Sequence, residues 1–227
     1  MGPDALVVVF RIGPFAITQT VVTTWAILVV LGAAAWLSTR DLRLDPGPWQ
    51  TAIEGMVSAA EDAVEAVLPG RTAEVLPFVG TLWVFILVAN LVGVVPGLHS
   101  PTADLSTTAA LAVLVFLSVH AYGIRASGWR AYLRHYVRPN PILLPFHVIG
   151  EITRTLALAV RLFGNIMSLE LAALLVLLVA GFLVPVPVLM LHVIEAVVQA
   201  YIFGMLALVY IAGAIQSRQQ SAGLSEE

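Results

Sequence analysis

The chain contains no cysteine and no lysine, and only 11% of its residues are charged. Without cysteine it can form neither a disulfide nor a thiolate metal site, and it has no cysteine nucleophile. All eleven basic residues are arginine, a side chain that stays charged at any accessible pH. The formal net charge of −3 is too small to indicate a nucleic-acid partner.

Apolar residues are abundant instead. Hydrophobic residues make up 59% of the 227 residues, and the mean hydropathy is +0.95. This is far more apolar surface than one soluble core can bury, so the composition predicts a polytopic membrane protein. No secretory signal peptide is expected, because Asp4 and Arg11 bracket an apolar run that is too short.

Three segments are nearly free of charge and long enough to cross a hydrocarbon core of about 30 Å as a helix. They are residues 15–37, 75–95 and 105–124. Two longer helical patterns follow at 146–184 and 188–215. The first of these would be about 57 Å long as one rod, so it must be strongly tilted, bent or divided. We therefore expect an all-α membrane fold with about five transmembrane helices.

Residues 49–68 differ from these spans. Apolar side chains recur there at helical spacing, and the acidic side chains Glu54, Glu61, Asp62 and Glu65 take the other side. The pattern predicts an amphipathic interfacial helix, which Pro69 and Gly70 end. Its acidic face favours contact with a protein over attraction to anionic lipid.

Arginines after the first and third spans indicate the topology. Arg40 and Arg43 follow the first span, and a basic cluster interleaved with aromatic residues fills 125–138. The positive-inside rule places both in the cytoplasm. The N-terminus is then outside, and residues 216–227 form a cytoplasmic tail that carries Arg218.

Prolines mark the limits of the long helices in this prediction. Pro139, Pro141 and Pro145 should prevent a regular helix before about Phe146, and prolines at 185 and 187 should form the turn between the two long helices.

The stretch 152–171 carries Arg154, Arg161, Asn165 and Glu170 inside an apolar helix. A charge in hydrocarbon is expensive, so such residues indicate a functional site. At about 100° per residue the two arginines share a face, Asn165 lies about 40° away, and Glu170 lies opposite. A structural ion pair within the helix is disfavoured, because such pairs are spaced three or four residues apart.

In the last helix His192, Glu195 and Gln199 form one stripe. Such groups can relay protons or line a water path, or they can serve only as hydrogen bonds between helices. We favour a path for the triplet, and hydrogen bonding for His192 alone. Zinc would need a third ligand such as Glu170 from elsewhere, so neither a metal nor a cofactor is predicted.

Two motifs resemble the signature stretches of subunit a of rotary F-type ATP synthases. They are LALAVRLFGNIMSLE at 156–170 and VVQAYIFGMLALVYI at 197–211. Weaker matches at 77–97 and 101–112 extend the resemblance to about residues 70–215. The chain departs from the family at His147, where many members have Glu, and at Thr155, where proline is common.

The resemblance implies a mechanism. The two long helices lie tilted against a rotating ring of subunit c, Arg161 faces the ring carboxylate, and two offset half-channels deliver protons or sodium ions to it. Asn165, Glu170, His192 and Gln199 match functional positions of the family, and Glu195 is additional. We also name the secondary candidates Arg154, His147, Glu151, Asn90 and Asp104.

The resemblance further implies a non-catalytic subunit of the bacterial inner membrane. Its partners would be the subunit c ring, the lipid bilayer, and subunit b through helix 49–68 and the first span. Two alternatives remain: a self-contained secondary transporter, against which no inverted repeat is evident, and a non-transporting membrane assembly protein. A soluble enzyme is disfavoured, because no nucleophile–base or phosphate-loop motif stands out.

Overall fold

Five helices are long and apolar enough to cross a membrane, counted over the residues that the computed structural model describes: 8–12, 15–40, 45, 47–95, 98–129, 144–180 and 185–223. They are α1 (Gln19–Arg40), α3 (Thr72–Val92), α4 (Leu105–Ser127), α6 (Leu144–Ala180) and α7 (Pro185–Gly223). The predicted all-α membrane fold is confirmed.

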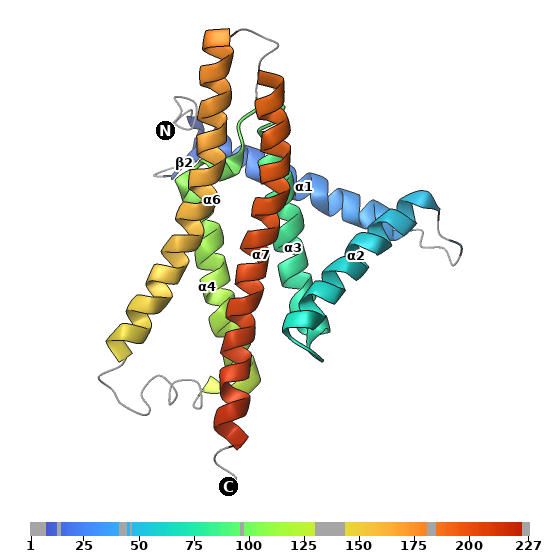
Figure 1. Ribbon diagram of the computed structural model, residues 1–227, viewed down its shortest axis with the longest axis vertical. Coiled ribbons are helices and arrows are strands. Elements are labelled where there is room, and N and C mark those ends of the chain that lie inside the picture. Colours follow the sequence, from blue (N-terminus) through green and yellow to red (C-terminus); the bar gives the residue numbers. More distant parts are fainter. Residues whose placement is uncertain are drawn as a thin grey trace.

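Helix α7 is the centre of the bundle. Helices α3, α4 and α6 all pack against it, and α4 also packs against α6. Half of the apolar stretch of α7 is buried, against only 11% of that of α6. Figure 1 shows α6 and α7 side by side along the long axis of the molecule, with α3 and α4 beside them. Helix α6 therefore keeps most of its apolar surface open.

Helix α1 runs across the direction of the two long helices (Figure 1). Its 22 residues span about 33 Å, while the 37 residues of α6 span about 55 Å. Trp25 and Val29 of α1 are 57% and 71% exposed, as expected of side chains that face lipid. A bilayer that holds α1 upright therefore leaves α6 and α7 strongly inclined.

The amphipathic helix α2 (Pro48–Val67) joins α1 to α3. It begins with proline. No hydrogen bond is lost there, because a backbone N–H in the first turn of a helix has no acceptor within the helix. Val64 is fully buried, and α2 packs on α3 and α7. The turn after α2 contains Gly70 at φ +77°, a conformation that glycine adopts without a steric penalty.

Residues 15–18, which were predicted to begin the first transmembrane helix, are a β-strand instead. Strand β2 (Phe15–Thr18) pairs antiparallel with β1 (Val8–Ile12), with Phe10 opposite Ile17. Aromatic and β-branched residues dominate both segments and suit a strand. Helix α1 begins only at Gln19.

Three prolines that were predicted to lie outside regular helix, Pro145, Pro185 and Pro187, are helical, while Pro139 and Pro141 lie outside the described residues. Helix α6 begins at Leu144 with Pro145 as its second residue, and α7 begins at Pro185 with Pro187 as its third. Amide groups in the first turn have no intrahelical acceptor, so proline is tolerated there.

Other helix ends also differ from the predicted limits. Helix α7 continues to Gly223, so residues 216–223 of the predicted tail are helical. Helix α3 begins and ends three residues earlier than predicted, and α4 runs three residues further. Residues 181–184 and Arg130, Arg134 and Arg138 lie outside the described residues.

A short connection joins α3 to α4 and includes the 3-10 turn η1 (Pro101–Ala103). Asp104 caps α4, because its carboxylate accepts hydrogen bonds from the backbone N–H and the hydroxyl of Ser106, both at 2.9 Å. Turn η1 packs against α6. The connection therefore brings polar loop residues to the middle of the bundle.

Candidate functional site

Two contacts set the register of the α6–α7 pair. The amide nitrogen of Asn165 donates to Oε1 of Gln199 at 2.9 Å. Eleven residues earlier on α6, the Arg154 guanidinium lies 4.5 Å from the ring centroid of Tyr210, which is eleven residues later on α7. The two helices are therefore antiparallel neighbours along this whole length.

Arg161 lies between these two contacts and is exposed. Within the described residues its guanidinium has neither an ion pair nor a hydrogen bond to another side chain. An unneutralised arginine inside an apolar helix is costly in a membrane. The side chain of Arg161 is thus open to groups beyond the described residues.

Arg154 has partners of its own, although it is predicted to share a helix face with Arg161. Its guanidinium forms an ion pair with Glu151 at 3.3 Å and stacks on Tyr210 of α7. These contacts hold the Arg154 guanidinium within this chain, near the beginning of α6. His147 is exposed one helical turn before Glu151.

Glu170 of α6 and His192 of α7 converge on the end of α3. A Cβ atom on Gly93 would lie 3.0 Å from Oε1 of Glu170 and 3.3 Å from Cε1 of His192. The same glutamate oxygen accepts a hydrogen bond from the backbone N–H of Ser100 at 2.9 Å. The structure thus brings together two predicted site residues from different helices.

His192 and Gln199 are each only 1% exposed. Nε2 of both side chains has no hydrogen-bond partner within the described residues. Glu195, between them on α7, is half-buried. Buried polar atoms are normally paired, so these two nitrogens are exceptions among the described residues.

A buried hydrogen-bond network at the end of α3 lies next to Glu170. The hydroxyl of Ser100 donates to the carbonyl of Ala89 at 2.8 Å and lies 2.6 Å from the Thr102 hydroxyl. Thr102 donates to Oδ1 of Asn90 at 2.6 Å, and Asn90 donates to the carbonyl of Ala196 on α7 at 3.4 Å. Asn90 therefore orients the loop that holds Glu170.

Sequence reasoning missed Ser100, Thr102 and Gly93. Their only sequence signal is a pair of hydroxyl residues around Pro101 between two spans, which is also typical of an ordinary turn. Asp104 was predicted as a secondary site residue, and it is the cap of α4.

A second missed contact joins α3 to α7. The indole N–H of Trp83 donates to the carbonyl of Tyr201 at 3.2 Å, and the two rings stack with 6.2 Å between centroids. A Cβ atom on Gly204 would overlap the Trp83 indole. Glycine at 204 thus allows the close approach that keeps His192 and Gln199 against α3.

A family model described as the ATP synthase A chain matches residues 20–212. The chain belongs to this family. The ATP synthase subunit a 2 of Pelobacter propionicus is 66% identical over 218 residues, which are 96% of this chain and 96% of that protein. The ATP synthase subunit a of Legionella pneumophila (strain Paris) is 61% identical over 211 residues, 92% of each chain.

A more distant family member shows how far the likeness extends. The ATP synthase subunit a 2 of a Bradyrhizobium species is 45% identical over 216 residues, 95% of this chain and 97% of that protein. The matches to the family run through α1, α3, α4, α6 and most of α7. The predicted membership of the ATP synthase A chain family is therefore confirmed.

Proposed function

We propose that this chain is the ion-translocating stator subunit in the membrane sector of a rotary ATP synthase. Arg161 would face the carboxylates of a rotating ring of subunit c. The observation that carries the proposal is the exposed Arg161, unpaired within the described residues, on a helix that leaves most of its apolar surface open. Membership of the ATP synthase A chain family supports it.

The chemistry of arginine suits this role. A permanent cation attracts each ionised ring carboxylate and displaces the ion that the carboxylate carries. Because the guanidinium does not deprotonate, Arg161 cannot itself pass protons from one side of the membrane to the other. Each charge that crosses the full potential releases about 2.3 kcal/mol per 100 mV, so several are needed for each ATP.

Glu170 and His192 would belong to one access path to the ring. Both can bind and release a proton, and they meet beside Gly93. Glu170 is nine residues from Arg161, or about 13.5 Å along α6. Asn165, Gln199 and Glu195 would line the route between this group and the ring.

The second access path would lie beyond Arg161, at the beginning of α6. Glu151 and His147 are the polar side chains there, and Arg154 is held by Glu151 and Tyr210. Under the positive-inside rule this end is cytoplasmic and the Glu170 end is outside. The N-terminus would then be outside and the C-terminus in the cytoplasm of a bacterial inner membrane.

The arm formed by α1 and α2 would bind the peripheral-stalk subunit b. Its acidic side chains Glu54, Glu61 and Asp62 are exposed on α2, and α1 exposes apolar side chains along its length. The arm thus offers both charge and an apolar helix surface to a membrane-anchored partner.

Replacing Arg161 tests the proposal. We expect Arg161→Ala to lower gradient-driven ATP synthesis in membrane vesicles by about 100-fold or more, as the loss of one preorganised electrostatic group can. The amount of assembled complex on native gels should stay close to wild type, because an outward side chain does not hold the fold.

Arg154→Ala is the matched control, since it removes an equal charge seven residues away. Its partners are Glu151 and Tyr210 in the same chain, so coupling should fall far less. Wild-type synthesis in Arg161→Ala would refute the proposed role.

A further inference from the structure

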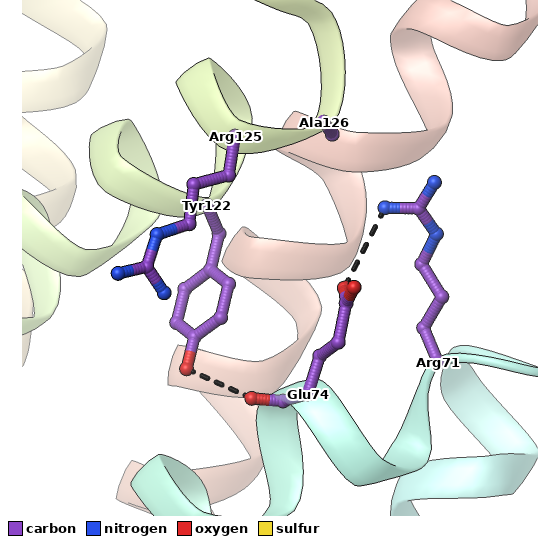
Figure 2. Close-up of a pocket in the computed structure, with 5 residues that line it drawn as sticks. All are labelled: Arg71, Glu74, Tyr122, Arg125 and Ala126. Atoms are coloured by element: carbon purple, nitrogen blue, oxygen red, sulfur yellow. Dashed lines mark hydrogen bonds and ion pairs between the residues drawn. The ribbon is translucent and has the colours of Figure 1, made fainter.

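A pocket of about 150 Å³ opens where the beginning of α3 meets the end of α4. Arg71, Glu74, Tyr122, Arg125 and Ala126 line it, and Figure 2 shows their side chains. The Tyr122 hydroxyl donates to the backbone carbonyl of Glu74 at 3.1 Å and so ties the two helix ends together.

This pocket is remote from the place where Glu170 and His192 meet. Glu74 and Asn90 are sixteen residues apart on α3, or about 24 Å. No residue of the proposed ion path lines the pocket. The pocket is therefore not part of the access path that we propose at Glu170 and His192.

The pocket lies where two membrane spans end on the same side. The apolar span of α3 begins at Thr72, and that of α4 ends at Ala126. Trp129, which follows α4, is 61% exposed. Arginine, tyrosine and tryptophan at span ends mark the level of the lipid headgroups. The pocket therefore opens where phosphate groups are concentrated.

The charges of the pocket are unequal. Arg71 is paired with the Glu74 carboxylate at 3.6 Å, whereas Arg125 has no ion pair within the described residues. Figure 2 shows the Arg125 guanidinium across the Tyr122 ring from the Arg71–Glu74 pair. The pocket thus carries one excess positive charge. Guanidinium groups bind phosphate oxygens through a planar fork of N–H donors.

We propose that this pocket binds the headgroup phosphate of a membrane phospholipid. Arg125 supplies the uncompensated charge, and Arg71 contributes less because Glu74 holds it. The position at the end of two spans favours a lipid over free phosphate as the source of the group.

The test uses the intact complex, stripped of lipid in an uncharged detergent and titrated with phosphatidylglycerol. Native mass spectrometry then measures the lipid retained by this chain. Arg125→Gln should weaken retention of one lipid about fivefold, the effect of one arginine near a charged surface. Glu74→Gln should strengthen retention, since it frees Arg71 and keeps the backbone carbonyl that Tyr122 binds.

Arg40→Gln is the matched control. Arg40 also lies in the last turn of a span, over Trp36 at 5.3 Å and outside the pocket, so retention should match wild type. Arg125→Lys, which keeps the charge, should restore part of the retention and so separate loss of charge from loss of fold.

Three results would overturn the proposal. The first is equal retention in Arg125→Gln and Arg40→Gln. The second is equal retention of diacylglycerol, which has the same chains and no phosphate. The third is displacement of the lipid by millimolar inorganic phosphate, which would assign the pocket to the free ion.

Discussion

Polar side chains on the two faces of the α6–α7 hairpin differ in burial and in their partners. On the inner face, which comprises Glu170, His192 and Gln199, the side chains are buried or half-buried, where α6 packs on the η1 connection and α7 packs on α3. On the outer face Arg161 is exposed and has no partner within the described residues. The inner face is therefore packed within this chain, whereas the outer face leaves Arg161 open to the ring of subunit c that we propose as its partner.

Arg154 sharpens this contrast. It is predicted to share a helix face with Arg161, yet Glu151 and Tyr210 bind it. Two arginines seven residues apart on one helix thus have different surroundings. Changes on the inner face should affect folding and ion access together, whereas a change at Arg161 should affect coupling alone.

The largest effect that we expect on folding comes from Gly204→Ala. The added Cβ would overlap the Trp83 indole, and moving that ring would break its hydrogen bond to Tyr201. Overpacking of this kind costs about 1–3 kcal/mol. We expect less assembled complex and a lower thermal unfolding midpoint.

Gly213→Ala is the control for this change. It lies on the same helix, and a Cβ there would meet no atom within 4 Å. Its unfolding midpoint should equal or slightly exceed that of wild type. Equal midpoints for the two variants would contradict the close α3–α7 contact.

Glu170→Gln and His192→Ala test the inner face as an ion path. Each should lower proton flux per complex about tenfold, less than Arg161→Ala, because water can replace a missing polar group at a cost of up to about 2 kcal/mol. Flux can be measured by dye quenching in reconstituted vesicles. Asp45→Asn, at an exposed carboxylate that precedes α2, is the control. Unchanged flux in both inner variants would remove them from the path.

Gly93→Ala asks whether packing and ion access on the inner face can be separated. The new Cβ would lie 3.0 Å from Oε1 of Glu170 and 3.1 Å from Cβ of Ser100, so both must shift slightly. We expect a cost of about 1 kcal/mol and a few-fold lower flux at near-normal assembly. Gly80→Ala is the control, because Gly80 lies on α3 with open space around it, and it should behave as wild type. Reduced assembly of Gly93→Ala with normal flux per complex would make Gly93 a packing position only.

The smallest effect lies outside both faces, at the corner between α2 and α3. Hydrogen bonds from the Thr72 hydroxyl and from the Gly70 backbone N–H lower the pKa of the Glu65 carboxyl below its ordinary value. A carboxyl pKa that is lower in the folded state stabilises the fold. This stabilisation is fully present above the unfolded-state pKa of about 4.3, and it is lost as the pH falls through the folded-state pKa.

Thr72→Val removes the hydrogen bond that lowers the Glu65 pKa more than the Gly70 bond does. It should lower the unfolding midpoint slightly at pH 7, and its difference from wild type should shrink as the pH falls below about 4. A difference that does not change with pH would mean that the Thr72 hydroxyl acts independently of the Glu65 charge.

Much of the fold follows from hydropathy alone. The five long apolar helices and the one-sided α2 were predictable, since each pattern spans twenty residues or more. The β1–β2 hairpin and the helical roles of Pro145 and Pro185 were not. These features depend on the conformational preferences of a few residues, which a hydropathy average over about twenty residues does not resolve.

The sequence by itself determined which polar residues lie inside apolar helices, and the motif around Arg161 determined the family. Only the tertiary structure decided which of them meet. Glu170 comes from α6, His192 from α7, and Gly93 and Ser100 from the connection between α3 and α4. Arg154 of α6 contacts Tyr210 on α7. The physical reason is that hydropathy and helical spacing report how one segment meets its surroundings, whereas contacts between segments depend on the register and close approach of whole helices.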